Sequence, residues 1–203
     1  MNLQTTFTRI PALRMLIILL TLIVASGCAY TPMTVTLTPD TMVTTSDIGN
    51  GKTVYLTVAD ERDSDTVGNR GAAMMKGAKI TLEQDLAAVV QSALVEMLQK
   101  KGFDVSHDGA YGMRPSLKVD IRGLEYSTST GFWTGGVQVT AALKATVEAE
   151  TERYENFYRF DNEDRVVVVP GAESNNERIN AALNDVLHQL IRDNKLLELL
   201  AKG

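Results

Sequence analysis

The single cysteine of this chain stands where its thiol could accept a lipid. Cys28 follows an apolar run of ten residues, Met15–Val24, and the small residues Ala25–Gly27. The run has the length of a secretory signal, about half of what a membrane span needs, and small residues fit the narrow pockets of a signal peptidase. We predict a bacterial lipoprotein processing site, with cleavage between Gly27 and Cys28 and with diacylglycerol and an N-acyl chain on Cys28. The alternatives are ordinary cleavage that leaves a free thiol, or an uncleaved anchor.

Lipid attachment also predicts where the protein resides. A lone cysteine agrees with it, because exported domains usually carry cysteines in pairs. In enterobacterial lipoproteins an Asp after the lipidated cysteine is typical of inner-membrane retention, and here Ala29 takes that place. We expect a lipid-anchored protein of the outer membrane that faces the periplasm and carries no cofactor besides its covalent lipid.

Charge and length limit the partners and the number of domains. Removal of residues 1–27 takes away two Arg and no acid, which changes the net charge from -5 to -7. Such an acidic domain lacks a basic footprint, so we expect no nucleic-acid partner and a membrane affinity that comes from the lipid. We predict that residues 28–51 form the lipidated N-terminus and a tether with one edge strand. Residues 52–203 then form a single α+β periplasmic domain.

The histidines do not form a catalytic set. His107 is expected in a turn beside Asp108, and His188 lies on a predicted helix. A metal centre or a catalytic triad needs more convergent partners than these, and no Gly-x-Ser-x-Gly elbow occurs. We therefore expect no catalytic residue, no metal site and no enzyme.

Two polar stretches between residues 60 and 71 could hold ions. The first contains the acids Asp60, Glu61, Asp63 and Asp65, but their spacing does not match an EF-hand loop. We interpret it as a solvated loop with Arg62 and Arg70 as counter-charges. The second, Gly68–Gly71, could cradle an anion with free backbone amides before a helix, although it lacks the Lys-Ser/Thr of a nucleotide loop.

One loop combines large aromatic side chains with small residues. Phe132 and Trp133 lie between glycines at 131 and 135, and large rings in such loops often anchor a partner. We predict a partner surface formed by Phe132, Trp133, Arg62 and Arg70. The alternative is that both rings fold back into the core.

Hydrophobic periodicity predicts the elements that hold these residues. Strands are expected at 53–59 near the sheet centre, 103–105, 117–126 with a bulge at Gly123, 137–149 and 154–160, with an edge strand or a packed loop at 166–169. Residues 64–79 are expected to form a loop. Helices are expected after capping boxes at Thr81–Gln84 and Ser174–Glu177, with a short third helix at 195–201. The predicted fold class is α+β, a two-layer sandwich of a mostly antiparallel sheet of four to five strands with two main helices packed on one face.

The chain resembles the YajG-like family of bacterial lipoproteins, whose function is unassigned. The resemblance rests on Cys28 after its signal, Val58–Arg62 followed by Gly68–Arg70, the Phe132-Trp133 loop, and the end of the terminal helix at 191–196. The element order is also similar to small envelope lipoproteins that assist transport or assembly. These similarities imply a non-catalytic binding or accessory module for an envelope protein or glycan. The alternative is a carrier or weak hydrolase that holds a lipid or cell-wall fragment between sheet and helices.

Overall fold

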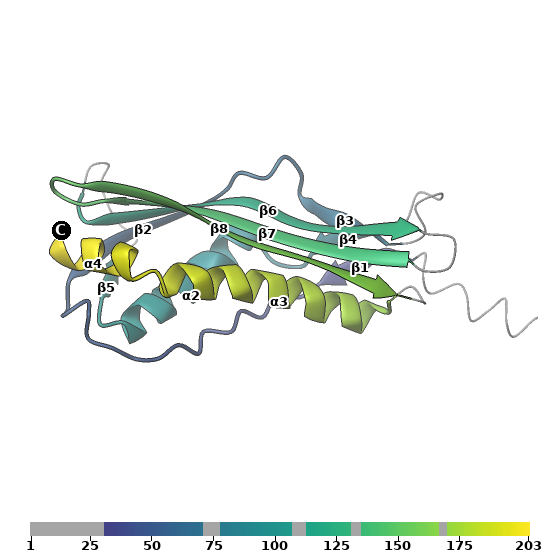
Figure 1. The fold of residues 1–203 in the computed structure, drawn as a ribbon, viewed down its shortest axis with the longest axis horizontal. Coiled ribbons are helices and arrows are strands. Elements are labelled where there is room, and N and C mark those ends of the chain that lie inside the picture. The colour runs from purple at the N-terminus through teal and green to yellow at the C-terminus, as the bar shows by residue number, and fades with distance from the viewer. Residues whose placement is uncertain (1–30, 71–77, 107–112, 131–134, 167–169) are drawn as a thin grey trace, which may run out of the picture.

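The computed structural model describes residues 31–70, 78–106, 113–130, 135–166 and 170–203. In these ranges an eight-stranded sheet carries three helices on one face (Figure 1). The strands are β1 (Met33–Val35), β2 (Thr53–Asp60), β3 (Thr66–Arg70), β4 (Ala78–Leu82), β5 (Asp104–Ser106), β6 (Ser116–Thr130), β7 (Gly135–Glu148) and β8 (Arg153–Val166). The helices are α2 (Leu86–Lys100), α3 (Ala172–Ile191) and α4 (Asn194–Lys202).

Three long strands give the sheet two distinct ends. β6, β7 and β8 form an antiparallel meander in which Glu148 of β7 lies opposite both Ser116 of β6 and Arg153 of β8. On the other edge of β6, β2 pairs with its first half and β3 pairs at Tyr126 near its end. We call the end with β1, the end of β6 and the start of α3 the β1 end, and the opposite end with α4 the α4 end (Figure 1).

The predicted fold class was wrong in the number and direction of the strands and in the number of helices. The sheet has eight strands instead of four to five. Four of its seven pairings, β1 with β4, β2 with β5, β2 with β6 and β3 with β6, are parallel. The described part of the chain has three helices rather than the two main ones of the predicted fold class, and the third, α4, agrees with the short helix expected at 195–201.

The main cause is the stretch 64–79, which contains β3 and the start of β4 where a loop was expected. Gly68 explains why the strand signal is weak there. A Cβ at Gly68 would lie 1.9 Å from the carbonyl oxygen of Tyr126, so only glycine lets β3 approach β6 this closely. A glycine that weakens a strand signal is thus what allows this strand to pair.

Both predicted capping boxes were wrong, whereas other local signals were confirmed. Thr81 lies in β4, and α2 begins after Asp85, whose carboxylate accepts the Ala88 amide at 2.7 Å. α3 begins after Gly171 without a side-chain cap. The bulge beside Gly123 is present as predicted, and Gly102 after α2 has a left-handed conformation.

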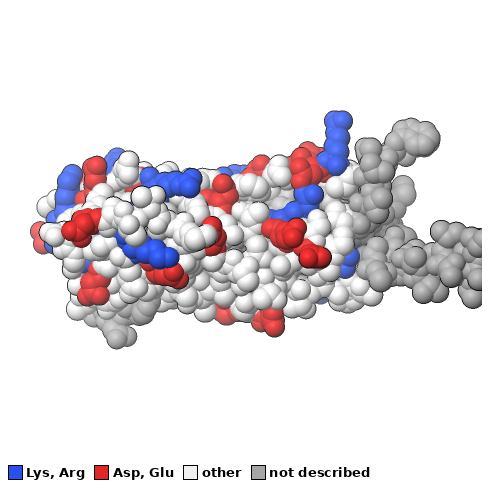
Figure 2. Space-filling model, turned by 90° about the horizontal axis from the view of Figure 1, so that it is seen from below, with Lys and Arg blue, Asp and Glu red and all other residues white. Residues whose placement is uncertain are grey.

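The core fills the space between the sheet and the helices. It contains the inward residues of β6 and β7 and the apolar stripes of α2 and α3, nearly all fully buried. The helix side of the surface carries acidic and basic side chains that are interspersed among uncharged areas (Figure 2). No broad basic area covers the described part of that side.

Candidate functional site

The segment after β1 crosses the helices on their side away from the sheet. We call residues 36–44 the strap. Its backbone is bonded to side chains of α3 and of the turn before α2: Asn176 Oδ1 accepts from Thr36 N (3.1 Å), Asn180 Oδ1 from Thr38 N (2.7 Å), Asn184 Oδ1 from Asp40 N (2.8 Å) and Gln84 Oε1 from Leu37 N (2.9 Å). Lys100 of α2 also donates to the Thr41 carbonyl oxygen at 3.0 Å, so the strap joins α2 to α3.

The spacing of the asparagines explains why the strap follows α3 so regularly. Four residues of helix rise about 6 Å, and two residues of extended chain span about 6.6 Å. Asn176, Asn180 and Asn184 are four apart and bond every second strap residue. One turn later, Nε2 of His188 lies 2.8 Å from the Asp40 carbonyl oxygen. The predicted absence of a catalytic role for His188 stays a prediction, but its observed contact is to the strap.

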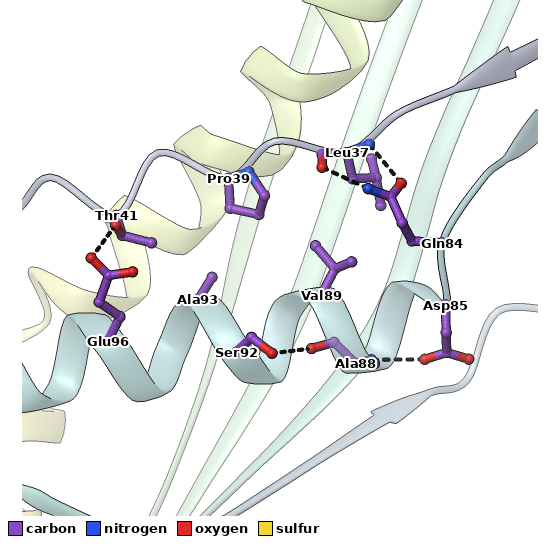
Figure 3. Close-up of a pocket in the computed structure, with 10 residues that line it drawn as sticks. All are labelled: Leu37, Pro39, Thr41, Gln84, Asp85, Ala88, Val89, Ser92, Ala93 and Glu96. Atoms are coloured by element: carbon purple, nitrogen blue, oxygen red, sulfur yellow. Dashed lines mark hydrogen bonds between the residues drawn. The ribbon is translucent and has the colours of Figure 1, made fainter.

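On the α2 side, the strap leaves a shallow groove of about 420 Å³. Figure 3 shows Pro39 above Val89 and Ala93, with hydrogen bonds closing both ends of the groove. At one end Gln84 pairs with both backbone groups of Leu37, and at the other Thr41 donates to Glu96 at 2.7 Å. The groove lies outside the sheet–helix layer in which the carrier alternative would hold its ligand.

The folded unit begins shortly after the predicted lipid site. β1 pairs with β4 from Met33 onward, and Val35 and Leu37 are buried. Residues 33–51, which were expected to belong to a tether with one edge strand, are thus packed on the domain. Only five residue steps separate Cys28 from Met33.

The β1 end contains a buried polar cluster of Arg70, Tyr126, Asn175 and Pro170. The Tyr126 hydroxyl donates to Asn175 Oδ1 at 3.0 Å, and Asn175 Nδ2 donates to the Pro170 carbonyl oxygen at 3.4 Å. Arg70 Nη2 reaches the same carbonyl oxygen at only 3.5 Å, and its Nε is buried without a partner. Burial raises the pKa of Tyr126, which the nearby charges of Arg70 and Arg178 partly oppose. The cluster has more donors than acceptors.

The structure does not bring Arg62 and Arg70 together. β2 ends beside Ile121, whereas β3 pairs with Tyr126, about 17 Å further along β6. Arg62 binds Asp60 through two hydrogen bonds of 2.9 and 2.8 Å, and this contact is the main cause that lowers the pKa of Asp60. Arg62 thus has a carboxylate partner that Arg70 lacks.

A second charged group lies on the sheet face opposite the helices. Its central residue, Asp120, is only 3% exposed. It pairs with Lys118 at 2.8 Å and Arg122 at 3.7 Å, and both cations also pair with Glu61. Hydrogen bonding to Asp120 raises the pKa of Lys118. The paired charges explain how an acid can be buried here, so we assign this group to stability.

At the α4 end, Asp193 collects hydrogen bonds. Its Oδ2 accepts from the Tyr154 hydroxyl (3.0 Å), Asn156 Nδ2 (2.9 Å) and the Tyr158 hydroxyl (2.7 Å), and its Oδ1 caps α4 through Leu196 N (3.1 Å). Burial alone would raise the pKa of Asp193, but these donors outweigh it and lower the pKa. Burial is also the main cause that raises the pKa of Tyr158.

Several predicted site residues fall outside the described residues. These are Gly27, Cys28, His107, Phe132 and Trp133. In the ranges that are described, no group of three or more His, Cys, Asp or Glu side chains is arranged to hold a metal ion. No helix of those ranges is long and apolar enough to cross a membrane.

The sequence interpretation missed the strap and the polar cluster at the β1 end. A signal for the strap exists, because Asn176, Asn180, Asn184 and His188 recur at intervals of four beside the apolar stripe of α3. No local signal links Arg70 to Asn175, which are 105 positions apart and meet only through the pairing of β3 with β6.

The strand order and the helix layer define an α/β domain with a mixed sheet, of a kind that other proteins share. The chain belongs to a family of uncharacterized lipoproteins, whose model matches residues 39–201, and this confirms the resemblance to the YajG-like family. Membership implies a lipid-anchored protein of the cell envelope, and the family description indicates no catalytic function.

One solved structure shares the fold at low sequence identity, and another resembles the chain more weakly. The crystal structure of an uncharacterized protein matches with a TM-score of 0.52 and 10% identity, over 80% of this chain and 98% of the other. Protein XCC0632 from Xanthomonas campestris matches with a TM-score of 0.44 and 15% identity, over 85% and 94% of the two chains. No curated protein matches the chain.

Proposed function

We propose that this chain is an outer-membrane lipoprotein, acylated at Cys28 after removal of residues 1–27, that faces the periplasm. Its domain acts as a non-catalytic binding module for an envelope protein or glycan close to the membrane. The observation that supports this best is the strap, which fixes the chain to both helices soon after Cys28.

The strap limits how far the domain can move from its anchor. Five residue steps from Cys28 to Met33 span about 17 Å at full extension. A freely flexible tether over 28–51 would have allowed far more. The domain would therefore stay beside the headgroup layer, with its β1 end nearest the bilayer because β1 lies there (Figure 1). Partners would have to lie within the same short distance of the headgroup layer.

The first test is the chemistry of the anchor. We expect the mature chain to carry acyl chains on Cys28 and to fractionate with the outer membrane. The Cys28→Ser variant should lose both properties. An unacylated wild-type chain in soluble fractions would overturn the proposal.

The second test measures the distance of each end from the membrane. The acylated chain is placed in vesicles that contain headgroup spin-labelled lipid, and broadening of amide signals is recorded by NMR. Thr34 and Ser127 at the β1 end should broaden strongly. Thr151 and Arg153 at the α4 end should not, because the 14-residue β7 separates the two ends by about 45 Å.

An insertion provides the matched control. Twenty Gly/Ser residues after Ala29 lengthen the link to about 28 Å on average, within a much wider spread of distances. Broadening at Thr34 and Ser127 should then fall while the fold is unchanged. Equal broadening at both ends of the original chain would show that the domain is not held by its β1 end.

A further inference from the structure

Arg70 is a buried cation without a counter-charge. It is 4% exposed, and among the described residues it forms no ion pair. Among the described residues its only hydrogen bond is the 3.5 Å contact from Nη2 to the Pro170 carbonyl oxygen, at the outer limit for such a bond. A guanidinium stays charged at every physiological pH, and removing a charge from water costs several kcal/mol unless a partner compensates it.

The sequence shows that the remaining connections at this end do not supply the missing carboxylate. Residues 71–77, 131–134 and 167–169 contain no Asp or Glu. Every acidic residue of the chain except Asp108 lies in the described ranges, and Asp108 is two positions after the end of β5, a strand that lies at the α4 end. A counter-charge for Arg70 would therefore come from outside the chain.

The start of α3 adds a second attraction for anions at the same place. The 20-residue helix begins after Gly171, and no side chain caps its first amides. Such amides carry about half a positive charge in total. A Cβ built on Gly171 would meet no heavy atom within 4 Å, so space is open beside these amides.

The two features converge at Pro170. Arg70 Nη2 contacts its carbonyl oxygen, and Pro170 directly precedes Gly171. Arg178 lies one turn after Ser174, with its Nε 3.5 Å from Ser174 Oγ, and among the described residues Asp164 pairs with Arg178 and not with Arg70. Glu173 is the acid of the first turn and is exposed. The net charge of the cluster at the β1 end is positive.

We infer that Arg70 and the first amides of α3 form a binding site for a phosphate group. Arg and helix N-termini both favour the several acceptor oxygens of a phosphate. The group could belong to a membrane lipid headgroup or be free phosphate. The headgroup source rests on the proposed function, because only a short link at Met33 would bring the β1 end to the headgroup layer. The site itself does not depend on that link.

The experiment uses the mature acylated chain in uncharged detergent. Amide and Arg Nε–Hε signals are followed by NMR during titration with inorganic phosphate and, separately, with short-chain phosphatidylglycerol, at constant ionic strength. The Arg70 Nε–Hε and the amides of residues 172–174 should shift and saturate. Absence of saturable shifts with both probes would overturn the site. Should Cys28 prove unacylated, the same titration on that chain still tests the site, which separates its failure from failure of the proposed function.

Three variants test the role of each group. Arg70→Met should weaken phosphate binding about tenfold or more, because a charge-assisted partner is lost. Glu173→Gln should strengthen it about twofold to threefold, since a like charge leaves the first turn. Arg153→Met makes the same substitution at the α4 end and should bind as the unchanged chain does. Equal binding by Arg70→Met and the unchanged chain would overturn the inference.

The two probes then distinguish the sources of the phosphate. At least tenfold tighter binding of phosphatidylglycerol would assign the site to lipid headgroups. Equal or tighter binding of inorganic phosphate would assign it to free phosphate and exclude the headgroup source.

Discussion

The two ends of the sheet hold opposite charges in opposite ways: Asp193 is half-buried and Arg70 is buried. At the α4 end the Asp193 carboxylate receives three side-chain donors and caps a helix. At the β1 end the Arg70 guanidinium has one long contact, and a buried nitrogen has no partner. A charge whose hydrogen-bond partners are all present is typical of a structural role, whereas a buried charge without a counter-charge needs an explanation, which the proposed phosphate site would supply.

Substitution of Asp193 by Ala should have the largest effect on stability. It removes the cap of α4 and leaves the hydroxyls of Tyr154 and Tyr158 without their acceptor, at a cost of about 3 kcal/mol of unfolding free energy. Urea denaturation measures the loss. Asp161→Ala removes an exposed carboxylate from β8 and should leave the urea midpoint nearly unchanged. Equal losses in both variants would show that Asp193 is not a structural centre.

Tyr158→Phe sharpens the comparison by removing one donor and keeping the ring. Tyr158 is buried, and its hydroxyl makes the shortest of the side-chain bonds to Asp193, 2.7 Å. The loss of one hydrogen bond to a charged group should cost about 1.5 kcal/mol. Urea denaturation of Tyr158→Phe, alone and combined with Asp193→Ala, would measure the coupling between the two side chains in unfolding free energy. Strictly additive losses would contradict a shared hydrogen-bond network.

Acid should weaken the α4 end through Asp193. Its folded pKa is lowered, so its contribution is complete above the unfolded pKa of about 3.9 and is lost as the pH falls through the folded value. We expect the difference in unfolding free energy between the unchanged chain and Asp193→Asn to shrink as the pH falls below about 4. A difference that stays constant from neutral pH to pH 2 would show that the charge of Asp193 contributes nothing.

These two ends also show which parts of the molecule the sequence could predict. A short helix after Asp193-Asn194 was predicted, because an Asp before an apolar stripe is a local signal. The tyrosines that bind Asp193 lie 35 and 39 residues away and depend on the register of β7 with β8. Local periodicity does not contain that information.

The β1 end was harder to predict for the same physical reason. Arg70 was assigned to a polar loop, because Gly68 and its neighbours weaken the strand signal of β3. The parallel pairing of β3 with β6 is long-range, and it alone brings Arg70 to Tyr126 and Asn175. The arginine itself was singled out from sequence, but its burial and its missing partner could only come from the fold.

Arg70→Met should give the smallest change in the free energy of unfolding. The sign of that change distinguishes the β1 end from the α4 end. In phosphate-free buffer the variant should be as stable as the unchanged chain or about 1 kcal/mol more stable, because a buried charge without a partner is replaced by an apolar chain of similar length. Added phosphate should stabilise only the unchanged chain, since a ligand that binds the folded state shifts the equilibrium by its concentration relative to Kd. Urea denaturation with and without phosphate measures both effects. A variant that is less stable in both buffers by the same amount would make Arg70 a structural charge like Asp193, and the contrast between the two ends would disappear.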